Sequence, residues 1–335
     1  MVTIKDVALL AGVSASTVSR AITGDVQVNE PTRLRVQEAI SALGYRPNRI
    51  ARNLRRQRSE TIGVVVSDIE NPHFTRAVRA IEDAAYRQGY RVILCNTDET
   101  LEKQQAYLEV LAAEQVVGVI LVPADAADPT VSELLDMKIP VVAFDRRVDD
   151  DRADAVFADN RDAAKVATTH LIASGRRHVA FISGRANIQT GAERLHGYEE
   201  VMSLHGMDAI VGVGDFRQDT ARLAMLRLLD QHPDIGGVVV ANNLMVIGVL
   251  EALRFRDVTV PGDIALVGID EPAWASLVQP ALTTLGQPTQ QMANRAFELL
   301  IERISGKREA TRFEVFHFQL HVRDSCGRRQ FDLSH

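Results

Sequence analysis

Six arginines lie between residues 46 and 58, and guanidinium groups at this density are suited to contact with a polyanion. They are Arg46, Arg49, Arg52, Arg55, Arg56 and Arg58. Such a block is equally typical of a solvated helix, and its spacing alone favours neither interpretation. Residues 1–60 carry a net charge of +5 although the whole chain carries −6, so the positive end is separate from an acidic body. This asymmetry excludes a uniformly basic nucleic-acid-binding protein.

No residue pattern in the sequence is typical of catalysis, of a metal site or of a nucleotide cofactor. An ordered Ser/His/Asp set, a nucleophile elbow, a G-x-G-x-x-G after a predicted strand and a P-loop lysine are all missing. His170, His178 and His196 fall in predicted helices or strands without visible partners, so we expect structural roles for them. Cys95 and Cys326 lack the spacing of metal ligands. We therefore expect no enzyme, no metal and no cofactor.

Two short helical patterns meet at Gly12 in the stretch TIKDVALLAGVSASTVSRAITG. Thr3 and Asp6 form a capping signature for the first helix, Ser14 can cap the second, and a third pattern covers residues 29–44. The outer side of the second helix carries Ala15, Ser16, Ser19 and Arg20. These features fit a helix-turn-helix, and the alternative is an ordinary three-helix subdomain without a ligand.

After residue 60, short apolar runs alternate with helical patterns, which is typical of a doubly wound α/β fold. The runs are TIGVVVS, RVILC, GVILV, VVAF, HVAFIS, GGVVVA and IALVGI. A hydrophobic content of 46% in 335 residues is enough to bury large cores. No apolar run reaches the length that spans a bilayer, and the first residues do not form a secretory signal. We therefore expect a cytoplasmic protein with no membrane partner.

Several motifs stand in one order along the chain, and together they are more specific than any one of them. They are TIKDVALLAGVSASTVSRAI, ALGYRPNRIARNL, SETIGVVVSDIENPHF, ADNRDAAKVATTHLIASGRRHVAFISG, ERLHGY, VPGDIALVGIDE and PALTTLGQP. In these motifs the chain resembles the lac-repressor (LacI/GalR) family of bacterial transcription regulators, up to about residue 325. The resemblance implies an N-terminal helix-turn-helix domain and two doubly wound α/β subdomains of the periplasmic-binding-protein type.

The resemblance also implies the domain boundaries. The helix-turn-helix domain takes residues 1–46, a hinge helix with its linker takes 47–60, the effector-binding and dimerisation domain takes 61–325, and a tail takes 326–335. Within the large domain, the first subdomain comprises about 61–159 with 289–318, and the second comprises 160–288 with 319–325. The chain would then cross between the two subdomains three times.

The DNA-binding residues are implied by the same resemblance. The second helix would lie in the major groove, where Ala15, Ser16 and Arg20 match the base-reading positions. Arg20 is the best candidate for specificity, because an arginine can donate two hydrogen bonds to guanine O6 and N7. Phosphate contacts, which hold register without reading sequence, are expected from Thr3, Ser14, Thr17, Ser19 and Asn29.

Residues 48–56 match the family's hinge helix, which orders on binding and inserts a leucine between base pairs in the minor groove. Leu54 fills that place, Asn48 and Ala51 share its side of the helix, and Arg52 would bind without regard to sequence. Unstacking costs about a few kcal/mol and is easiest at a pyrimidine–purine step, so we expect one at the centre of the operator. The alternative, Leu54 as a core leucine, leaves it on a strongly cationic helix with nothing to pack on.

Ligands of open α/β sheets bind at the carboxyl ends of the strands, and polar or aromatic residues stand at those places here. We expect effector contacts from His73, Phe74, Asp145, Arg146, Thr190, Arg194, Phe216, Asn242, Asp270, Trp274 and Gln287. Trp274 could equally pack beneath the cleft. The family often has Asp after Asn242, where this chain has Asn243. A sugar acid or sugar phosphate suits the two arginines, and a neutral sugar remains an alternative.

The resemblance implies a homodimer that binds a pseudo-palindromic double-stranded operator, represses transcription, and responds to a small-molecule effector, a sugar or sugar acid. When bound to DNA it would be associated with the nucleoid. The final residues VRDSCGRRQFDLSH contain no leucine heptads, which favours a dimer over a tetramer. The rival interpretation is a solute-binding protein with the same type of body and no DNA-reading role, which would need export.

Overall fold

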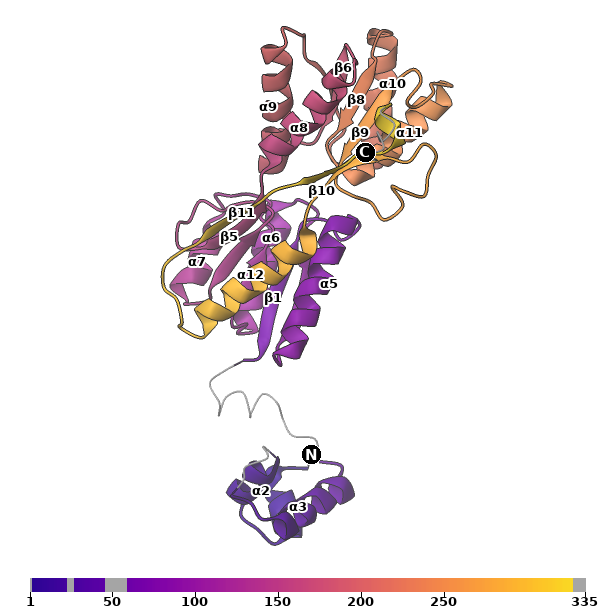
Figure 1. Cartoon of the computed structure of the whole chain (residues 1–335). Helices are drawn as coiled ribbons and strands as arrows, with labels where there is room; N and C mark the ends of the chain where they lie inside the picture. Colours follow the sequence, from indigo (N-terminus) through magenta and orange to yellow (C-terminus); the bar gives the residue numbers. More distant parts are fainter. Residues whose placement is uncertain (1, 23–26, 46–58, 328–335) are drawn as a thin grey trace, which may run out of the picture. The chain divides into compact units, whose positions relative to one another are not determined.

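The computed structural model describes residues 2–22, 27–45 and 59–327, and the chain divides into two compact units, Met1–Ser59 and Glu60–His335. The described part of the first unit (Figure 1) contains α1 (Ile4–Ala11), α2 (Ala15–Ile22) and α3 (Glu30–Leu43). These helices enclose a small core of Val7, Ala8, Ala11, Val18, Val36 and Ala39. The three helices predicted for this unit are confirmed.

Local caps and a glycine determine where these helices begin and end. The Asp6 carboxylate accepts hydrogen bonds from the Thr3 amide at 2.7 Å and from the Thr3 hydroxyl at 2.8 Å, and both bonds lower the pKa of Asp6. Gly12 ends α1 with a φ of +65°, which glycine adopts without strain. Asn29 Oδ1 accepts from the Thr32 amide at 3.0 Å where α3 begins. The turn between α1 and α2 therefore follows from the local sequence.

The second unit holds two six-stranded sheets, one in each α/β subdomain (Figure 1). The first sheet has the order β11-β5-β4-β3-β1-β2, and all its neighbouring strands are parallel. Its strands are β1 (Thr61–Val66), β2 (Arg91–Asn96), β3 (Val119–Leu121), β4 (Val141–Phe144), β5 (Asp154–Ala158) and β11 (Phe313–Phe316). The buried Val, Ile and Ala of the central strands are expected for a parallel sheet covered on both faces.

Two pairs of helices cover the first sheet. They are α5 (Pro72–Arg87) with α12 (Thr289–Ile304), and α6 (Leu101–Ala113) with α7 (Pro129–Asp136). The first pair buries a cluster that includes Phe74, Ile81 and Phe297, and the second pair buries a separate cluster that includes Leu108 and Leu134. The sheet is therefore enclosed between two hydrophobic layers.

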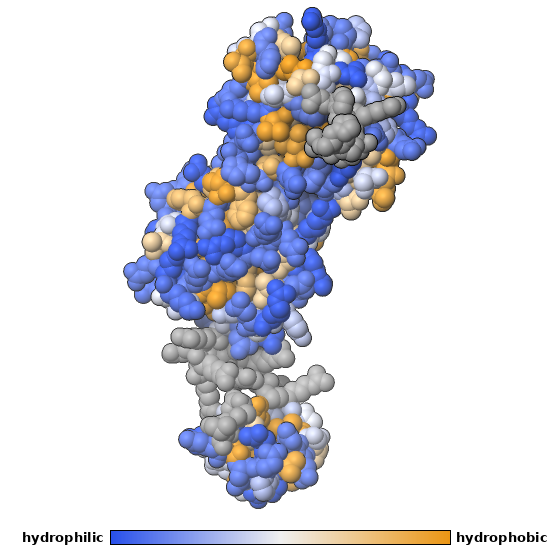
Figure 2. Space-filling model, viewed as in Figure 1, coloured by the Kyte–Doolittle hydropathy of each residue, from blue (hydrophilic) through white to orange (hydrophobic). Residues whose placement is uncertain are grey.

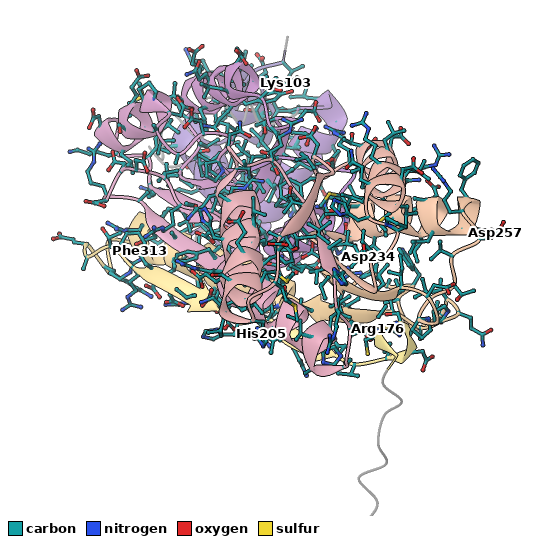
Figure 3. The ribbon with its side chains drawn as sticks, turned by 90° about the horizontal axis from the view of Figure 1, so that it is seen from above. Lys103, Arg176, His205, Asp234, Asp257 and Phe313 are labelled. Carbon is teal, nitrogen blue, oxygen red and sulfur yellow. The ribbon has the colours of Figure 1, made fainter. Side chains whose placement is uncertain are left out.

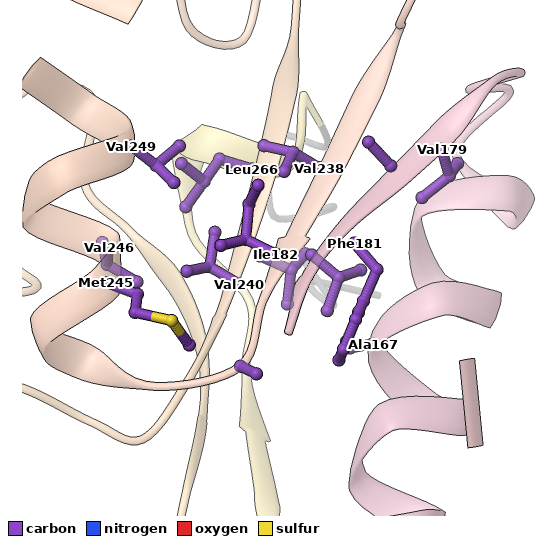
Figure 4. Packing of buried hydrophobic residues seen from close by; sticks show 14 of the residues in the cluster. Ala167, Val179, Phe181, Ile182, Val238, Val240, Met245, Val246, Val249 and Leu266 are labelled. Carbon is purple, nitrogen blue, oxygen red and sulfur yellow. The ribbon is translucent and has the colours of Figure 1, made fainter. Parts of the chain in front are cut away.

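The second sheet repeats this plan, with the order β12-β10-β9-β8-β6-β7 and only β12 antiparallel among its pairs. Its strands are β6 (Val179–Ser183), β7 (Ile210–Val213), β8 (Gly237–Val240), β9 (Ala265–Ile269), β10 (Thr283–Gly286) and β12 (Gln319–His321). Figure 4 shows Ala167 of α8 (Asn160–Ala173) and Val249 of α11 (Asn243–Phe255) on opposite sides of this sheet. The helix α9 (Gln189–Leu204) packs beside α8, and α10 (Gln218–Gln231) packs beside α11.

The chain passes between the subdomains three times, from β5 to α8, from β10 to α12 and from β11 to β12. Residues 60–159 and 289–316 form the first sheet with its helices, and residues 160–286 and 319–327 form the second. Each subdomain therefore takes its last strand from the end of the described chain. The predicted fold class, a helix-turn-helix domain followed by two doubly wound α/β subdomains, is confirmed.

The face of the second unit drawn in Figure 2 is mostly hydrophilic, with small separate hydrophobic patches. Phe313 of the edge strand β11 is 50% exposed and lies at the outer margin in Figure 3. Val315 of the same strand is exposed as well, and apolar atoms contribute much of the surface of any globular protein. No helix in the described ranges is long and apolar enough to cross a bilayer.

A buried carboxylate anchors the edge of the first sheet. Asp154 begins β5 and has no exposed surface. Arg303 donates to it at 3.0 and 3.2 Å, Arg308 at 2.9 and 2.6 Å, and the Arg312 amide at 2.7 Å. Burial raises the pKa of Asp154, but the hydrogen bonds from Arg308, Arg303 and the Arg312 amide lower it overall. The network joins β5 to the end of α12 and to the segment that leads into β11.

We expect Asp154→Asn to reduce the free energy of unfolding by about 3 kcal/mol, because two largely buried guanidinium groups lose their counter-charge. A lowered carboxylate pKa stabilises the fold above the unfolded-state value of about 4, and this contribution is lost as pH falls through the folded-state pKa. The difference between wild type and variant in denaturant titrations should therefore shrink below about pH 4. The exposed Asp208 provides the control variant Asp208→Asn. The same pH dependence in all three proteins would contradict this role of Asp154.

Candidate functional site

A cleft between the two subdomains collects residues that follow the parallel strands. The space between the atoms that line it, including the part open to solvent, is about 540 Å³. The first subdomain contributes Asp68, Asn71, His73, Phe74, Glu99, Asp145 and Arg146. The second contributes Arg185, Ile188, Thr190, Arg194, Asp215, Phe216, Arg217, Asn242 and Asp270, and Gln287 comes from a connecting segment.

The structure brings together ten of the eleven residues that the sequence predicted for an effector site. They are His73, Phe74, Asp145, Arg146, Thr190, Arg194, Phe216, Asn242, Asp270 and Gln287. Trp274 is not among the residues that line this cleft. Its half-buried side chain packs against the core of the second subdomain, because the turns after β9 carry it away from the end of the strand.

Seven further residues line the cleft that the sequence analysis did not single out. They are Asp68, Asn71, Glu99, Arg185, Ile188, Asp215 and Arg217. Glu99 follows β2 and Asp215 follows β7, and these two strands take equivalent edge places in their sheets. Arg185 follows β6 in the same way. The signal that pointed to Asp145, a charged residue just after a strand, would therefore have found these three as well.

Two cleft arginines each form a bidentate pair with a carboxylate, that is, two hydrogen bonds to its two oxygens. Arg146 donates to both oxygens of Glu99, at 2.6 and 2.7 Å, and also to the Pro123 carbonyl at 2.9 Å. Arg185 donates through Nε and Nη2 to the two oxygens of Asp215, the second bond being 3.1 Å long. Two-point pairs hold the guanidinium planes in fixed orientations. The charges of these arginines are therefore largely compensated within the protein.

Asp145 is a buried carboxylate beside a histidine and two arginines. His73 Nε2 lies 3.4 Å from its Oδ1, and Arg146 Nε lies 3.6 Å from its Oδ2. Burial raises the pKa of Asp145, but His73, Arg146 and Arg194 lower it overall, so the carboxylate stays ionised at neutral pH. Nε2 of His73 and Nε of Arg146 are buried without a hydrogen-bond partner in the part of the chain that the structure describes. Both atoms instead lie within ion-pair distance of the Asp145 carboxylate.

Arg194 connects the cleft to two of the connecting segments. The residue is only 3% exposed, and its Nε donates to Asn160 Oδ1 at 2.8 Å while Nη1 donates to the Ala241 carbonyl. Asn160 directly follows the passage from β5, and its Nδ2 donates back to the Ala158 carbonyl at 3.1 Å. The guanidinium carbon of Arg194 lies 5.8 Å from the ring centre of Phe318, between β11 and β12. A ligand that touches Arg194 therefore acts close to both passages of the chain.

Phe74 and Phe216 add aromatic surface from opposite subdomains. Phe74 is buried in α5, with its ring centre 5.0 Å from that of His73. Phe216 has a φ of +58°, and its ring lies so close to Gly184 that an added Cβ would be 2.0 Å from it. Gly184 therefore leaves the space that the ring fills. Aromatic faces beside carboxylates and guanidinium groups are suited to a small polyhydroxylated ligand.

Several cleft residues are held in an uncommon backbone conformation. Glu99, Asp145, Asp215 and Asp270 have φ values of +57°, +67°, +57° and +73°. Left-handed residues other than glycine gather at functional sites, because the surrounding structure must stabilise them. Gln287 Nε2 donates to Asp270 Oδ1 at 2.7 Å, while Gln287 Oε1 is buried without a partner among the described residues. The arrangement is one of prepared donors and acceptors, which is what ligand binding requires.

Metal binding has no support in the described residues, which contain no group of three or more His, Cys, Asp or Glu side chains that could hold an ion.

Eight of the predicted DNA contacts lie in the described part of the first unit. They are Thr3, Ser14, Ala15, Ser16, Thr17, Ser19, Arg20 and Asn29. On α2, Ser16 and Arg20 are exposed, while Val18 faces the core. Ser14 Oγ accepts from the Thr17 amide at 3.1 Å and so caps α2. The predicted hinge-helix contacts Asn48, Ala51, Arg52 and Leu54 lie outside the described residues and stay predictions.

Known proteins resemble this chain over nearly its whole length. The ribose operon repressor of Halalkalibacterium halodurans is 35% identical over 316 residues, which cover 94% of each chain. The transcriptional repressor PurR of Vibrio atlanticus is 34% identical over 322 residues, covering 95% of this chain and 96% of that one.

Solved structures show the same similarity. A lac repressor dimer bound to operator and the anti-inducer ONPF has a TM-score of 0.86 at 26% identity, covering 97% of this chain and 99% of that one. A complex of the transcriptional regulator CelR with cellobiose has a TM-score of 0.74 at 34% identity, covering 97% and 100%.

Two family models account for both units of the chain. The model of periplasmic binding proteins and the sugar binding domain of the LacI family matches residues 59–320, and the model of bacterial regulatory proteins of the lacI family matches residues 3–48. With relatives above 30% identity over more than nine tenths of the chain, these matches show that the protein belongs to the LacI family of bacterial regulatory proteins.

Proposed function

We propose that the protein is a sequence-specific DNA-binding transcriptional repressor, acting in the cytoplasm on the nucleoid and controlled by a small molecule in the cleft. One observation carries the proposal: a single chain contains a three-helix unit of helix-turn-helix form and a cleft of converging charged and aromatic side chains. Relatives named as repressors support the DNA-binding role, and the cellobiose complex of CelR supports a small-molecule ligand. These relatives are regulators, which favours regulation over catalysis.

Within this proposal, α2 reads the major groove. Arg20, exposed near the end of α2, would contact a guanine, and Ser16 would meet a neighbouring base. The hydroxyls of Thr3 and Ser14 and the amide side chain of Asn29 would bind phosphates, which position the helix without reading sequence. The +5 charge of residues 1–60 supplies the affinity that is independent of sequence.

The active form would be a homodimer on a pseudo-palindromic operator, with Leu54 of each copy wedged at a central pyrimidine–purine step. An effector in the cleft would change the angle between the subdomains and thereby the relation of the two hinge helices. If the effector prefers the conformation that does not bind DNA, it is an inducer, and with the opposite preference it is a corepressor.

The effector is proposed to be a sugar or sugar acid. A hydroxyl group can donate to Gln287 Oε1, one of the polar atoms of the cleft residues that lack a hydrogen-bond partner in the described chain. Phe74 and Phe216 offer faces for the apolar side of a sugar ring. A carboxylate or phosphate would have to compete with Glu99 and Asp215 for the paired arginines.

Selection of bound duplexes from a random pool tests the proposal. The purified full-length protein is incubated at moderate salt with and without each member of a panel of sugars and sugar acids. We expect a two-fold symmetric motif with a pyrimidine–purine centre, gained or lost with one compound. If no duplex is enriched under any condition while a panel compound binds the cleft, the chain acts as a solute-binding protein and the repressor proposal is wrong.

Arg20→Ala should relax the preference at one base position of each half-site and weaken specific binding by about 1–3 kcal/mol. Arg52→Ala should weaken binding to all sequences alike and reduce the slope of log affinity against log salt by about one. Both are measured by fluorescence anisotropy with the selected operator and with single-base variants over a salt series. Identical behaviour of the two variants would contradict this division of roles.

Gly184→Ala should displace the Phe216 ring, because the new methyl group would overlap it. Overpacking of this kind costs about 1–3 kcal/mol, so we expect about 10-fold weaker effector binding in calorimetry with the compound from the panel. Affinity for operator without effector should change little. Gly237→Ala is the control, since an added Cβ there meets its nearest neighbour, a Leu171 methyl carbon, at 3.3 Å. Equal losses in both variants would argue against a role for Phe216 in binding.

A further inference from the structure

Three side-chain hydrogen bonds join the subdomains in the described chain outside the connecting segments. Two of them, made by Arg76 and Gln189, involve exposed groups. The third is buried, with Asn243 Nδ2 donating to Asn71 Oδ1 at 3.2 Å. We propose that the Asn71–Asn243 pair is a latch that holds the cleft closed. The proposal concerns regulation of the ligand site proposed above, and it is tested without a ligand.

The direction of this hydrogen bond follows from the structure of α5. Asn71 is the N-cap of α5, and its Oδ1 accepts from the His73 amide at 3.0 Å. The same oxygen faces Asn243, so the group that approaches it must be a donor. An asparagine supplies an N–H there, whereas an aspartate at neutral pH has only acceptors and would repel Asn71 Oδ1.

The other half of the Asn243 amide indicates why an amide occupies this position. Asn243 is 4% exposed, and its Oδ1 has no hydrogen-bond partner in the described residues. A buried carbonyl without a partner is unfavourable, so the residue is not explained by its oxygen. Capping of α11 does not explain it either, since Asn242 Oδ1 already accepts from the Met245 amide at 2.8 Å. The hydrogen bond that Asn243 Nδ2 donates to Asn71 is therefore the contact that explains an amide at this position.

The latch sits where it can control access to the cleft. Asn71 lines the cleft from the first subdomain, and Asn243 follows Asn242, which lines it from the second. A hydrogen bond of this kind shifts an equilibrium by about 2- to 10-fold, and a ligand that requires the closed form gains apparent affinity by up to that factor. Asn71 caps α5 through a local bond, so opening the cleft can break the latch without unfolding the helix.

The test measures the distance across the cleft in the full-length protein. Spin labels are attached through Glu70→Cys and Asp219→Cys, both at exposed positions, while the native Cys95 and Cys326 are buried. In this background Asn243→Asp should lengthen the distance and lower the closed fraction by about 10-fold, because it places an unpaired acceptor against Asn71. Asn71→Ser should act in the same direction, since serine keeps the helix cap but is too short to reach Asn243. Asn187→Asp, at an exposed position, is the matched control.

Melting temperatures separate the latch from a merely structural role. Asn243 is the first residue of α11, where a carboxylate is favourable to the helix dipole, so Asn243→Asp should keep or raise the melting temperature while the distance increases. A structural role alone would lower the melting temperature and leave the distance unchanged. If both Asn243→Asp and Asn71→Ser keep the wild-type distance distribution, there is no latch, whatever DNA or effector binding shows.

Discussion

The direction of the parallel strands is the constraint on which the ligand cleft depends. Side chains that follow parallel strands gather at one edge of a sheet, and three passages of the chain hold two such edges beside one cleft. The cleft consequently receives short segments from eight different strand ends rather than one continuous loop. Asp145 directly follows the fully buried strand β4, which helps to explain how a charged side chain is held there at 5% exposure.

Sequence patterns predicted the doubly wound α/β class and the three helices of the first unit, the family resemblance implied the two subdomains, and the strand ends indicated ten residues that the structure places in one cleft. The alternation of apolar runs and helical patterns after residue 60 carries the information on the α/β class locally. The pairing of Glu99 with Arg146 and of Asp215 with Arg185 could not be predicted this way, because each pair joins segments that only the folded sheet brings together. Trp274 also follows a strand, yet the turns beyond β9 place it on a core instead of in the cleft. Strand ends thus indicate candidates, and the conformation of the following turn selects among them.

The cleft and the passages between the subdomains share side chains. Arg194 bonds to Asn160 beside one passage and lies over Phe318 in another, and Gln287, which lies in the third, bonds to Asp270. The side chains that line the cleft and the geometry of the connecting segments are therefore not independent. Such sharing is the physical basis for a coupling free energy between a bound molecule and the angle of two rigid bodies. A cleft lined by side chains of one subdomain alone would lack this coupling.

The last two strands of the described chain, β11 and β12, affect how the second unit folds during synthesis. The edge of β5 stays unpaired until β11 has been made, and the edge of β10 stays unpaired until β12 has been made. On the ribosome neither sheet is complete until translation has passed residue 312, whereas the three helices of the first unit are finished within the first 45 residues. The first unit can therefore fold early, while the edges of β5 and β10 are still exposed. During that interval the second unit depends most on protection from aggregation.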